Sequence, residues 1–263
     1  PHHNYWLDRA GYAPGNGWSE GHRDELDALL AKAEEDERQE PTFPDRPIIS
    51  IDAPTTRDVD DAFFIEARPG GGWNLTLALA CPAFRWPFGG KLDKAVFSRA
   101  TSIYLPEATH HMLPEALGTG AYSLLAQKTR PSLLIECTVG ADGLVTACEP
   151  RVGYARLAAN LCYEDCETVL DGGESPASPY LGQLRQALEL ARAHQERRIE
   201  KGAVIIERPD IVISLEGDGE NVTVSLDEDP PAPKAHLLVS ELMVLANAAL
   251  AAWAKEHGVA LLH

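Results

Sequence analysis

The sequence predicts an α+β protein with a mixed, largely antiparallel sheet core surrounded by helices. Short apolar runs separated by turn signals fill residues 47–80, and two later pairs of such runs are typical of hairpins. Other stretches repeat apolar residues at helical spacing. Because these strands and helices do not alternate as regular β-α-β units, the α+β class is favoured.

The first elements are a helix and a three-stranded sheet nucleus. Residues 1–46 form a lead-in with a Glu-rich linker helix that ends near Pro41. This whole segment could be the end of an N-terminal domain. We expect the charged run EEDERQE of this helix to be a solvated face. A second domain, residues 47–263, should then begin with strands at 48–51, 62–67 and 73–80.

The remaining elements are further helices and two hairpins. One hairpin joins SLLIECTV to LVTACEPRV through an Ala-Asp-Gly turn, and the other turns at Asp218 and Gly219. The helices are expected at 92–99, at 163–170, along the stripe of Leu181, Leu184, Leu188 and Ala191, and at 235–257. Because the last helix is more apolar than one buried face requires, we expect a further covering layer or subunit over it.

The composition bounds the environment and the partners. No apolar run approaches the ~20 residues of a membrane span, and no signal-peptide pattern begins the chain, so we expect no membrane partner. Five cysteines without a C-x-x-C pair favour a reducing, cytoplasmic compartment. The net charge of −17 argues against nucleic acid binding, unless the acids hold cations or basic contacts lie outside this segment.

The most informative stretch is SIDAPTTRDVDDAFF, which begins at Ser50. Asp52, Asp58, Asp60 and Asp61 lie within it, between one predicted strand and the next. Alternation along extended backbone lets Asp58 and Asp60 share a face, and the turn can bring Asp52 back towards them. Carboxylates a few ångströms apart repel by roughly 4 kcal/mol per pair at an effective dielectric of about 20, so the cluster needs a cation.

The ligand chemistry of this cluster indicates the cation. Oxygen ligands without His or Cys select Mg²⁺, or else Mn²⁺, over zinc, and such ions activate water against phosphodiesters. The alternative is that these acids have no function beyond starting a turn or a strand. Against it, Asp60 and Asp61 border an apolar strand, where aspartate is unfavourable. The D-x-D-D general acid of some terpene cyclases would need a helix here, and EF-hand spacing is absent.

The same stretch resembles the D-x5-D-x-D-D signature of the ribonuclease II (RNB) family. The resemblance covers about residue 45 to the end, through GKLDKAVFSRATSIYLP, HMLPEALGTGAYSLLAQKTRPSLLIECTVGADG, NLCYEDCETVL, KGAVIIERPD and LLVSELMVLANAALA. It implies the N-terminal part of an RNB-type catalytic domain. The implied activity is Mg²⁺-dependent 3′→5′ hydrolysis of single-stranded RNA to nucleoside 5′-monophosphates.

The resemblance also implies roles for single residues. Asp52, Asp58, Asp60 and Asp61 would hold the metal, which activates the attacking water. Asp58 and Asp60 would also be catalytic, and loss of Asp60 would stop hydrolysis while sparing binding. Tyr163 would orient the scissile phosphate. The residues that contact RNA would be Tyr104, stacked on the 3′-terminal base, together with Ile206 and Glu241.

Three positions depart from the family pattern. Ile206 stands where relatives carry an aromatic partner for the terminal base, which predicts a looser clamp. Cys81 stands where an Asp is common, and Ser240 stands where an acid is frequent, which leaves Glu241 as the nearby carboxylate. The family's domain continues into an Arg-containing stretch and usually an oligonucleotide-binding barrel, and we expect this missing C-terminal part to supply the basic contacts.

Two other functions stay open from the sequence. The chain could be a catalytically inactive RNA-binding regulator of the same fold, although such a protein has no need of four mutually repelling acids. It could also be a metal-dependent phosphohydrolase that acts on small nucleotides. Release of mononucleotides from an RNA ladder would separate the three possibilities.

Overall fold

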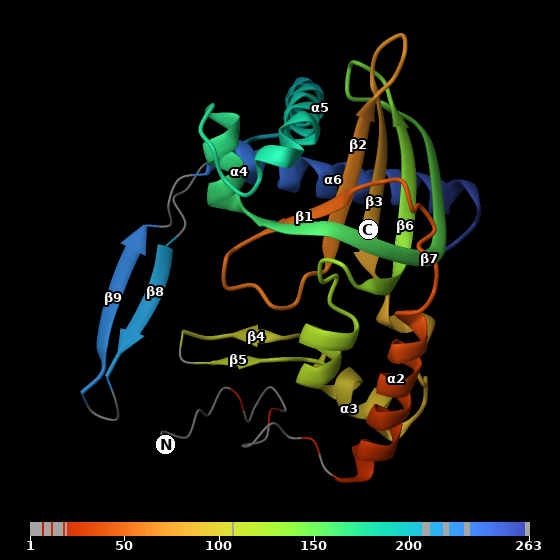
Figure 1. Cartoon of the computed structure of the whole chain (residues 1–263), viewed down its shortest axis with the longest axis vertical. Helices are drawn as coiled ribbons and strands as arrows, with labels where there is room; N and C mark the ends of the chain where they lie inside the picture. The colour runs from red at the N-terminus through yellow and green to blue at the C-terminus, as the bar shows by residue number, and fades with distance from the viewer. Residues whose placement is uncertain are drawn as a thin grey trace.

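Five strands close into a barrel at the centre of the molecule (Figure 1). The computed structural model describes Leu7, Tyr12, Trp18 and residues 20–106, 108–206, 211–217, 221–228 and 232–260. The barrel has the order β1-β2-β3-β6-β7, and its strands are β1 (Ile48–Asp52), β2 (Asp61–Ala67), β3 (Trp73–Ala80), β6 (Thr129–Val139) and β7 (Val145–Cys162). The predicted α+β class with a largely antiparallel sheet is confirmed.

The register of β1 closes the barrel. β1 pairs with β2 in the antiparallel sense and with β7 in the parallel sense, and the other neighbouring strands are antiparallel. At the end of β1, Asp52 lies opposite Cys162, the last residue of β7. At the start of β2, Asp61 lies opposite Leu79 of β3. The strand ends that carry acids are therefore fixed by pairing on both sides.

Both faces of the barrel strands are buried, which explains their continuous apolar runs. Neighbouring residues of a strand face opposite sides. Ile49, Phe63 and Leu77 join one large core cluster, whereas Ile48 and Ala62 join a second, smaller one. The large cluster also contains residues of α4 (Tyr163–Leu170), α5 (Leu181–Glu200) and α6 (Pro233–Glu256). In Figure 1, α6 passes behind the barrel, and α4 and α5 lie to the left of its upper part.

Helix α6 corrects the expectation that no apolar run reaches membrane-spanning length. Among the described residues, α6 is long and apolar enough by length and composition, with a mean hydropathy of 1.7 in its best window. Core helices of soluble proteins pass the same test, and 39% of that window is buried. Leu238, Leu242 and Leu245 form its buried stripe against the large core cluster.

The linker helix, α2 (Arg23–Asp36), leads into the charged run 34–40, which is mostly exposed, as expected, with Asp36 as a buried exception. Asp36, within the acidic run, is 1% exposed and accepts hydrogen bonds from Arg85 Nη2 and from the Tyr154 hydroxyl, each 2.9 Å long. The next acid, Glu37, pairs with Arg130 at 2.5 Å. The expected solvated face is therefore confirmed for most of this run. Asp36 is the exception: its Oδ1 accepts from Arg85 and Tyr154, and its buried Oδ2 has no hydrogen-bond partner among the described residues.

The segment between β3 and β6 folds into small elements that were largely not expected. It contains α3 (Lys91–Arg99), which was predicted, then the short pair β4 (Ile103–Tyr104) and β5 (Thr109–His110), and a π-helical turn, η3 (Ala116–Ala121). Short 3-10 turns lie at Glu20–His22, Pro82–Phe84 and Ser178–Tyr180. The second predicted hairpin is confirmed as β8 (Ile211–Glu216) and β9 (Thr223–Glu228), and its turn at Asp218 and Gly219 lies outside the described residues.

The β2–β3 turn offers a matched test of the fold. Gly70 and Gly72 both have positive φ, but a Cβ on Gly72 would lie 2.2 Å from the Val139 carbonyl oxygen, whereas one on Gly70 would meet nothing within 4 Å. We expect Gly72→Ala to lower the free energy of unfolding by about 1–3 kcal/mol more than Gly70→Ala, because only the former forces β6 to shift. Urea denaturation of the two variants measures this difference, and equal losses would contradict the turn's packing against β6.

Candidate functional site

The four aspartates lie where β1 ends and β2 begins. Asp52 closes β1 and Asp61 opens β2, so Asp58 and Asp60 belong to the connecting loop. Because Asp52 pairs with Cys162, the next residue, Tyr163, begins α4 at the same end of the barrel. The strand register thus places a tyrosine beside two of the acids.

Buried Val59 anchors the loop between them. Its N–H donates to Ser123 Oγ at 2.9 Å, its carbonyl accepts from the Leu124 N–H at 2.9 Å, and its side chain is 3% exposed. The Ser123 hydroxyl donates in turn to the Arg57 carbonyl at 3.0 Å. With Val59 turned inward, its neighbours Asp58 and Asp60, together with Asp61, line one cavity of about 520 Å³.

Burial and mutual repulsion raise the pKa of three of these acids. Burial is the main cause for Asp52, Asp60 and Asp61, and neighbouring aspartates add to it in each case. The pKa of Asp61 rises to about 6, with Asp52 and Asp60 as the named neighbours. These acids therefore lie close enough to oppose each other's ionisation, which is what a cation would relieve.

The oxygen atoms of the four aspartates suit a hard cation, although these side chains are not arranged around a single metal position. Within the described ranges, no three His, Cys, Asp or Glu side chains are grouped so as to hold a metal ion. However, Asp52 Oδ2 is buried without a hydrogen-bond partner among the described residues. A carboxylate oxygen accepts only, so such an atom suits a cation or a donor that a ligand supplies.

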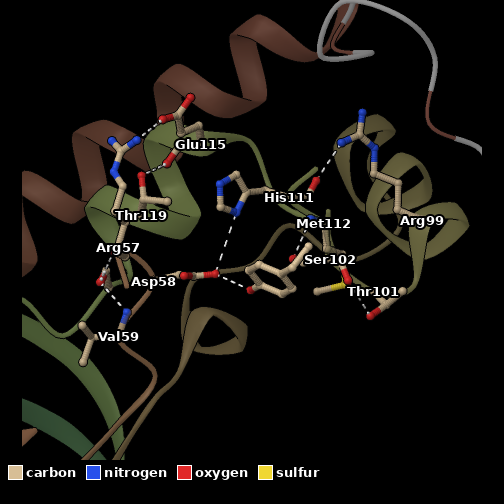
Figure 2. Close-up of polar contacts among 12 residues, drawn as sticks. Arg57, Asp58, Val59, Arg99, Thr101, Ser102, His111, Met112, Glu115 and Thr119 are labelled. Atoms are coloured by element: carbon tan, nitrogen blue, oxygen red, sulfur yellow. Dashed lines mark hydrogen bonds and ion pairs between the residues drawn. The ribbon is translucent and has the colours of Figure 1, made fainter. Parts of the chain in front are cut away.

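Asp58 is engaged by two side chains that border the cavity. The Tyr104 hydroxyl donates to Asp58 Oδ2 at 2.5 Å. His111 Nδ1 lies 3.8 Å from the same oxygen (Figure 2). Burial first, and then the bond to Asp58, raise the pKa of Tyr104 to about 12. As a whole the Tyr104 residue is 64% exposed, so its ring has an accessible surface.

Tyr163 lies beside the acids, as the sequence indicated. Its ring stacks on His236 of α6, with the centroids 3.9 Å apart and the planes at 16°. Burial, and then the charges of Asp52 and Asp61, raise the pKa of Tyr163 to about 12. Its hydroxyl therefore keeps its proton at neutral pH and can donate a hydrogen bond to an anion.

Two expected RNA contacts are not brought to this cavity. Ile206 follows α5 and is 72% exposed, but it does not line the cavity of the acids. Glu241 is buried between α5 and α6, where His194 Nδ1 lies 2.7 Å from its Oε2 and Arg198 donates to its Oε1. The side chain of Glu241 faces α5 in this structure, and its expected contact with RNA stays a prediction.

The structure adds three residues that the sequence did not single out. His111 reaches Asp58 from the segment after β5, and Met243 and Asn247 line the cavity from α6. No local pattern marks His111, since its contact depends on the tertiary path of residues 101–115. Met243 and Asn247 are four residues apart on one helix, so helical periodicity could have placed them on a common face.

The comparisons identify relatives that are longer than this chain. Residues 40–263 match the family model described as RNB domain. The chain is 31% identical over 210 residues to ribonuclease R of Vibrio cholerae, with 78% of this chain and 25% of the relative covered. It is 33% identical over 206 residues to exoribonuclease 2 of Klebsiella pneumoniae, with 76% and 31% covered. The chain thus spans about a quarter to a third of these relatives.

Solved structures share the fold. Apo RNase R of Mycoplasma genitalium matches with a TM-score of 0.75 at 20% identity, covering 92% of this chain and 41% of that one. The Dss1 exoribonuclease of Candida glabrata, an active-site mutant, matches with a TM-score of 0.75 at 21% identity, covering 98% and 36%. Yeast Ssd1, described as a pseudonuclease, matches with a TM-score of 0.51 at 21% identity, covering 65% and 20%.

The raised pKa of Asp61 predicts a pH dependence of stability. Because this pKa lies near 6 in the folded protein instead of 3.8, the folded state holds a proton that the unfolded chain releases between about pH 4 and pH 6. The unfolding free energy should therefore fall as the pH rises through this window, by roughly 2–3 kcal/mol from this group. Asp61→Asn should remove most of this fall.

Urea denaturation in chelator at pH 4.5 and pH 7.5 measures the effect. Asp142→Asn, at the exposed β6–β7 turn, is the control and should keep the wild-type difference between the two pH values. An unchanged difference in Asp61→Asn would assign the titration to another group.

Proposed function

Because the chain belongs to the RNB domain family, we propose that it is the metal-binding part of a 3′→5′ exoribonuclease that hydrolyses single-stranded RNA to nucleoside 5′-monophosphates. The observation that carries this proposal is the set of aspartates at the β1–β2 end of the barrel, whose members raise one another's pKa. Likeness to ribonuclease R and exoribonuclease 2 supports the reaction class, and the direction and product are those that the family resemblance implies.

The aspartates would hold Mg²⁺ or Mn²⁺. Asp52, Asp58, Asp60 and Asp61 supply oxygen ligands alone, which suits these ions better than zinc. A bound ion would activate the attacking water and stabilise the departing oxygen. The unpartnered Asp52 Oδ2 and the repulsion around Asp61 support this assignment. The Tyr104 hydroxyl donates a hydrogen bond to Asp58 Oδ2, so an ion that binds this oxygen would displace the hydroxyl or share the oxygen with it.

The tyrosines would position the RNA. The ring of Tyr104 offers a stacking surface for the 3′-terminal base, which suits a nuclease that tolerates any sequence because every base has a π-face. The Tyr163 hydroxyl, protonated at neutral pH, would donate to an oxygen of the scissile phosphate. One similar solved structure is described as RNase R in complex with ribose-methylated single-stranded RNA, which supports RNA as the ligand class.

The excess of acidic residues in this segment is consistent with cation binding here and basic RNA contacts elsewhere in the protein. The net charge of −17 suits a segment that holds cations, while the relatives extend well beyond the matched region. We propose that the remainder of the protein supplies an Arg-containing phosphate contact and an oligonucleotide-binding barrel. The five free cysteines support a reducing, cytoplasmic compartment.

A catalytically inactive RNA-binding protein is the second candidate, favoured by the fold likeness to the pseudonuclease Ssd1. The aspartates weigh against it. A protein that does not bind a cation would gain stability by replacing at least one of these mutually repelling, half-buried acids.

Asp60→Asn separates the two candidates in the full-length protein. We expect hydrolysis of a single-stranded RNA ladder to fall by about a hundredfold to a thousandfold, because the change removes a charge from the metal site, and loss of one transition-state contact has an effect of this size. RNA affinity, measured with a fluorescent oligonucleotide, should stay within a few fold. Asp142→Asn is the matched control and should retain wild-type turnover. Near-normal turnover in Asp60→Asn would overturn the site, and an inactive wild type that still binds RNA would favour the regulator.

Metal removal tests the ion independently of any substitution. Activity should vanish in excess chelator and return with Mg²⁺ or Mn²⁺, whereas zinc should not restore it because the ligands are carboxylates. Release of mononucleotides during a titration with each ion measures this. Full activity in chelator would rule out the proposed mechanism.

A further inference from the structure

One wall of the cavity that holds the acids belongs to α6. Met243 and Asn247 line this wall, and Asp58, Asp60 and Asp61 line the same cavity. Tyr104 also borders it. Asn247 therefore borders the same cavity as three of the proposed metal ligands and the proposed base-stacking residue.

Asn247 makes no side-chain hydrogen bond within the part of the chain that the structure describes. Between Glu241 and Lys255 it is the sole side chain of α6 that carries an amide, a hydroxyl or a charge. Its residue is exposed. Asparagine is a poorer helix former than the alanines and leucines around it, by up to about 0.7 kcal/mol. Neither helix formation nor a contact within the described protein accounts for it.

A neutral amide is well suited to this wall. A Lys or Arg would pair with the aspartates and compete with the cation for them. An apolar side chain would offer nothing to a polar ligand. The amide can donate two hydrogen bonds and accept others, while leaving the negative charge of the cavity unchanged.

We propose that Asn247 is a substrate-positioning residue whose amide hydrogen-bonds the ribose–phosphate backbone of the nucleotide that enters the cavity. This inference rests on the proposed function, since it takes RNA as the ligand. It gives α6 a part in substrate contact through Asn247, in place of Glu241, which is paired with His194 and Arg198 on another side of the helix.

Asn247→Leu in the full-length protein tests the proposal. Leucine has a similar size and is a better helix former, so the variant should unfold at the same temperature as the wild type or at a higher one. Its Kd for a single-stranded RNA oligonucleotide in chelator, and its KM with metal, should rise about 3- to 10-fold, as loss of one hydrogen bond to a ligand predicts. Binding and stability would then move in opposite directions, which a purely structural role would not produce.

Asn74→Leu is the matched control. Asn74 lies on an exposed position of β3, away from the cavity, where its amide donates to Glu66 at 3.2 Å. The control should bind RNA as the wild type does. Asn247→Ser, which keeps a hydroxyl at the cavity wall, should recover part of the lost affinity.

Oligonucleotides with single 2′-deoxy substitutions near the 3′ end identify the contacted group. If the amide contacts a ribose hydroxyl, one deoxy substitution should weaken wild-type binding and leave Asn247→Leu unaffected. If it contacts a phosphate oxygen, Asn247→Leu should weaken ribose and deoxyribose substrates equally. An affinity within twofold of wild type on all substrates, or weaker binding together with a lower unfolding temperature, would overturn the proposal. Loss of hydrolysis in the wild type would instead defeat the proposed function, and the binding comparison would still test Asn247.

Discussion

Repulsion among carboxylates at one end of the barrel is the constraint around which the rest of the structure is arranged. Asp52, Asp60 and Asp61 oppose one another's ionisation, yet the backbone holds them together. Strand pairing fixes Asp52 and Asp61, and the buried side chain of Val59 fixes the loop between them. The backbone therefore holds the aspartates close together against their mutual repulsion. A bound cation would relieve this repulsion.

Much of the fold could be predicted from the sequence because local patterns determine it. The apolar runs at β2 and β3 and the helical stripe of α5 appear where expected. Closure of the barrel could not be predicted, because it depends on β1 pairing with the far end of β7. The burial of Asp36 was missed for a similar reason, since the Arg85 and Tyr154 groups that donate to its Oδ1 are distant in sequence.

The candidate site divides in the same way. The aspartates and Tyr163 follow from spacing and family resemblance, and strand register then brings them to one end of the barrel. The α6 contribution did not follow, because a single sequence does not show which face of an apolar helix meets the site. Glu241 was favoured as the nearby carboxylate, but it pairs with His194 and Arg198 of α5, whereas neutral Asn247 lines the cavity of the acids.

The parallel pairing of β1 with β7 has a consequence for how the protein is made. Ser50 and Asn160, which hydrogen-bond across this pair, are 110 residues apart in sequence. Closing so long a loop carries an entropic cost, and folds with such distant contacts form slowly. During synthesis β1 must wait with one unpaired edge until β7 has left the ribosome. A nascent or truncated chain lacking β7 could not hold Asp52 in register with Cys162, so the acidic end of the barrel would become ordered only after β7 has been synthesised.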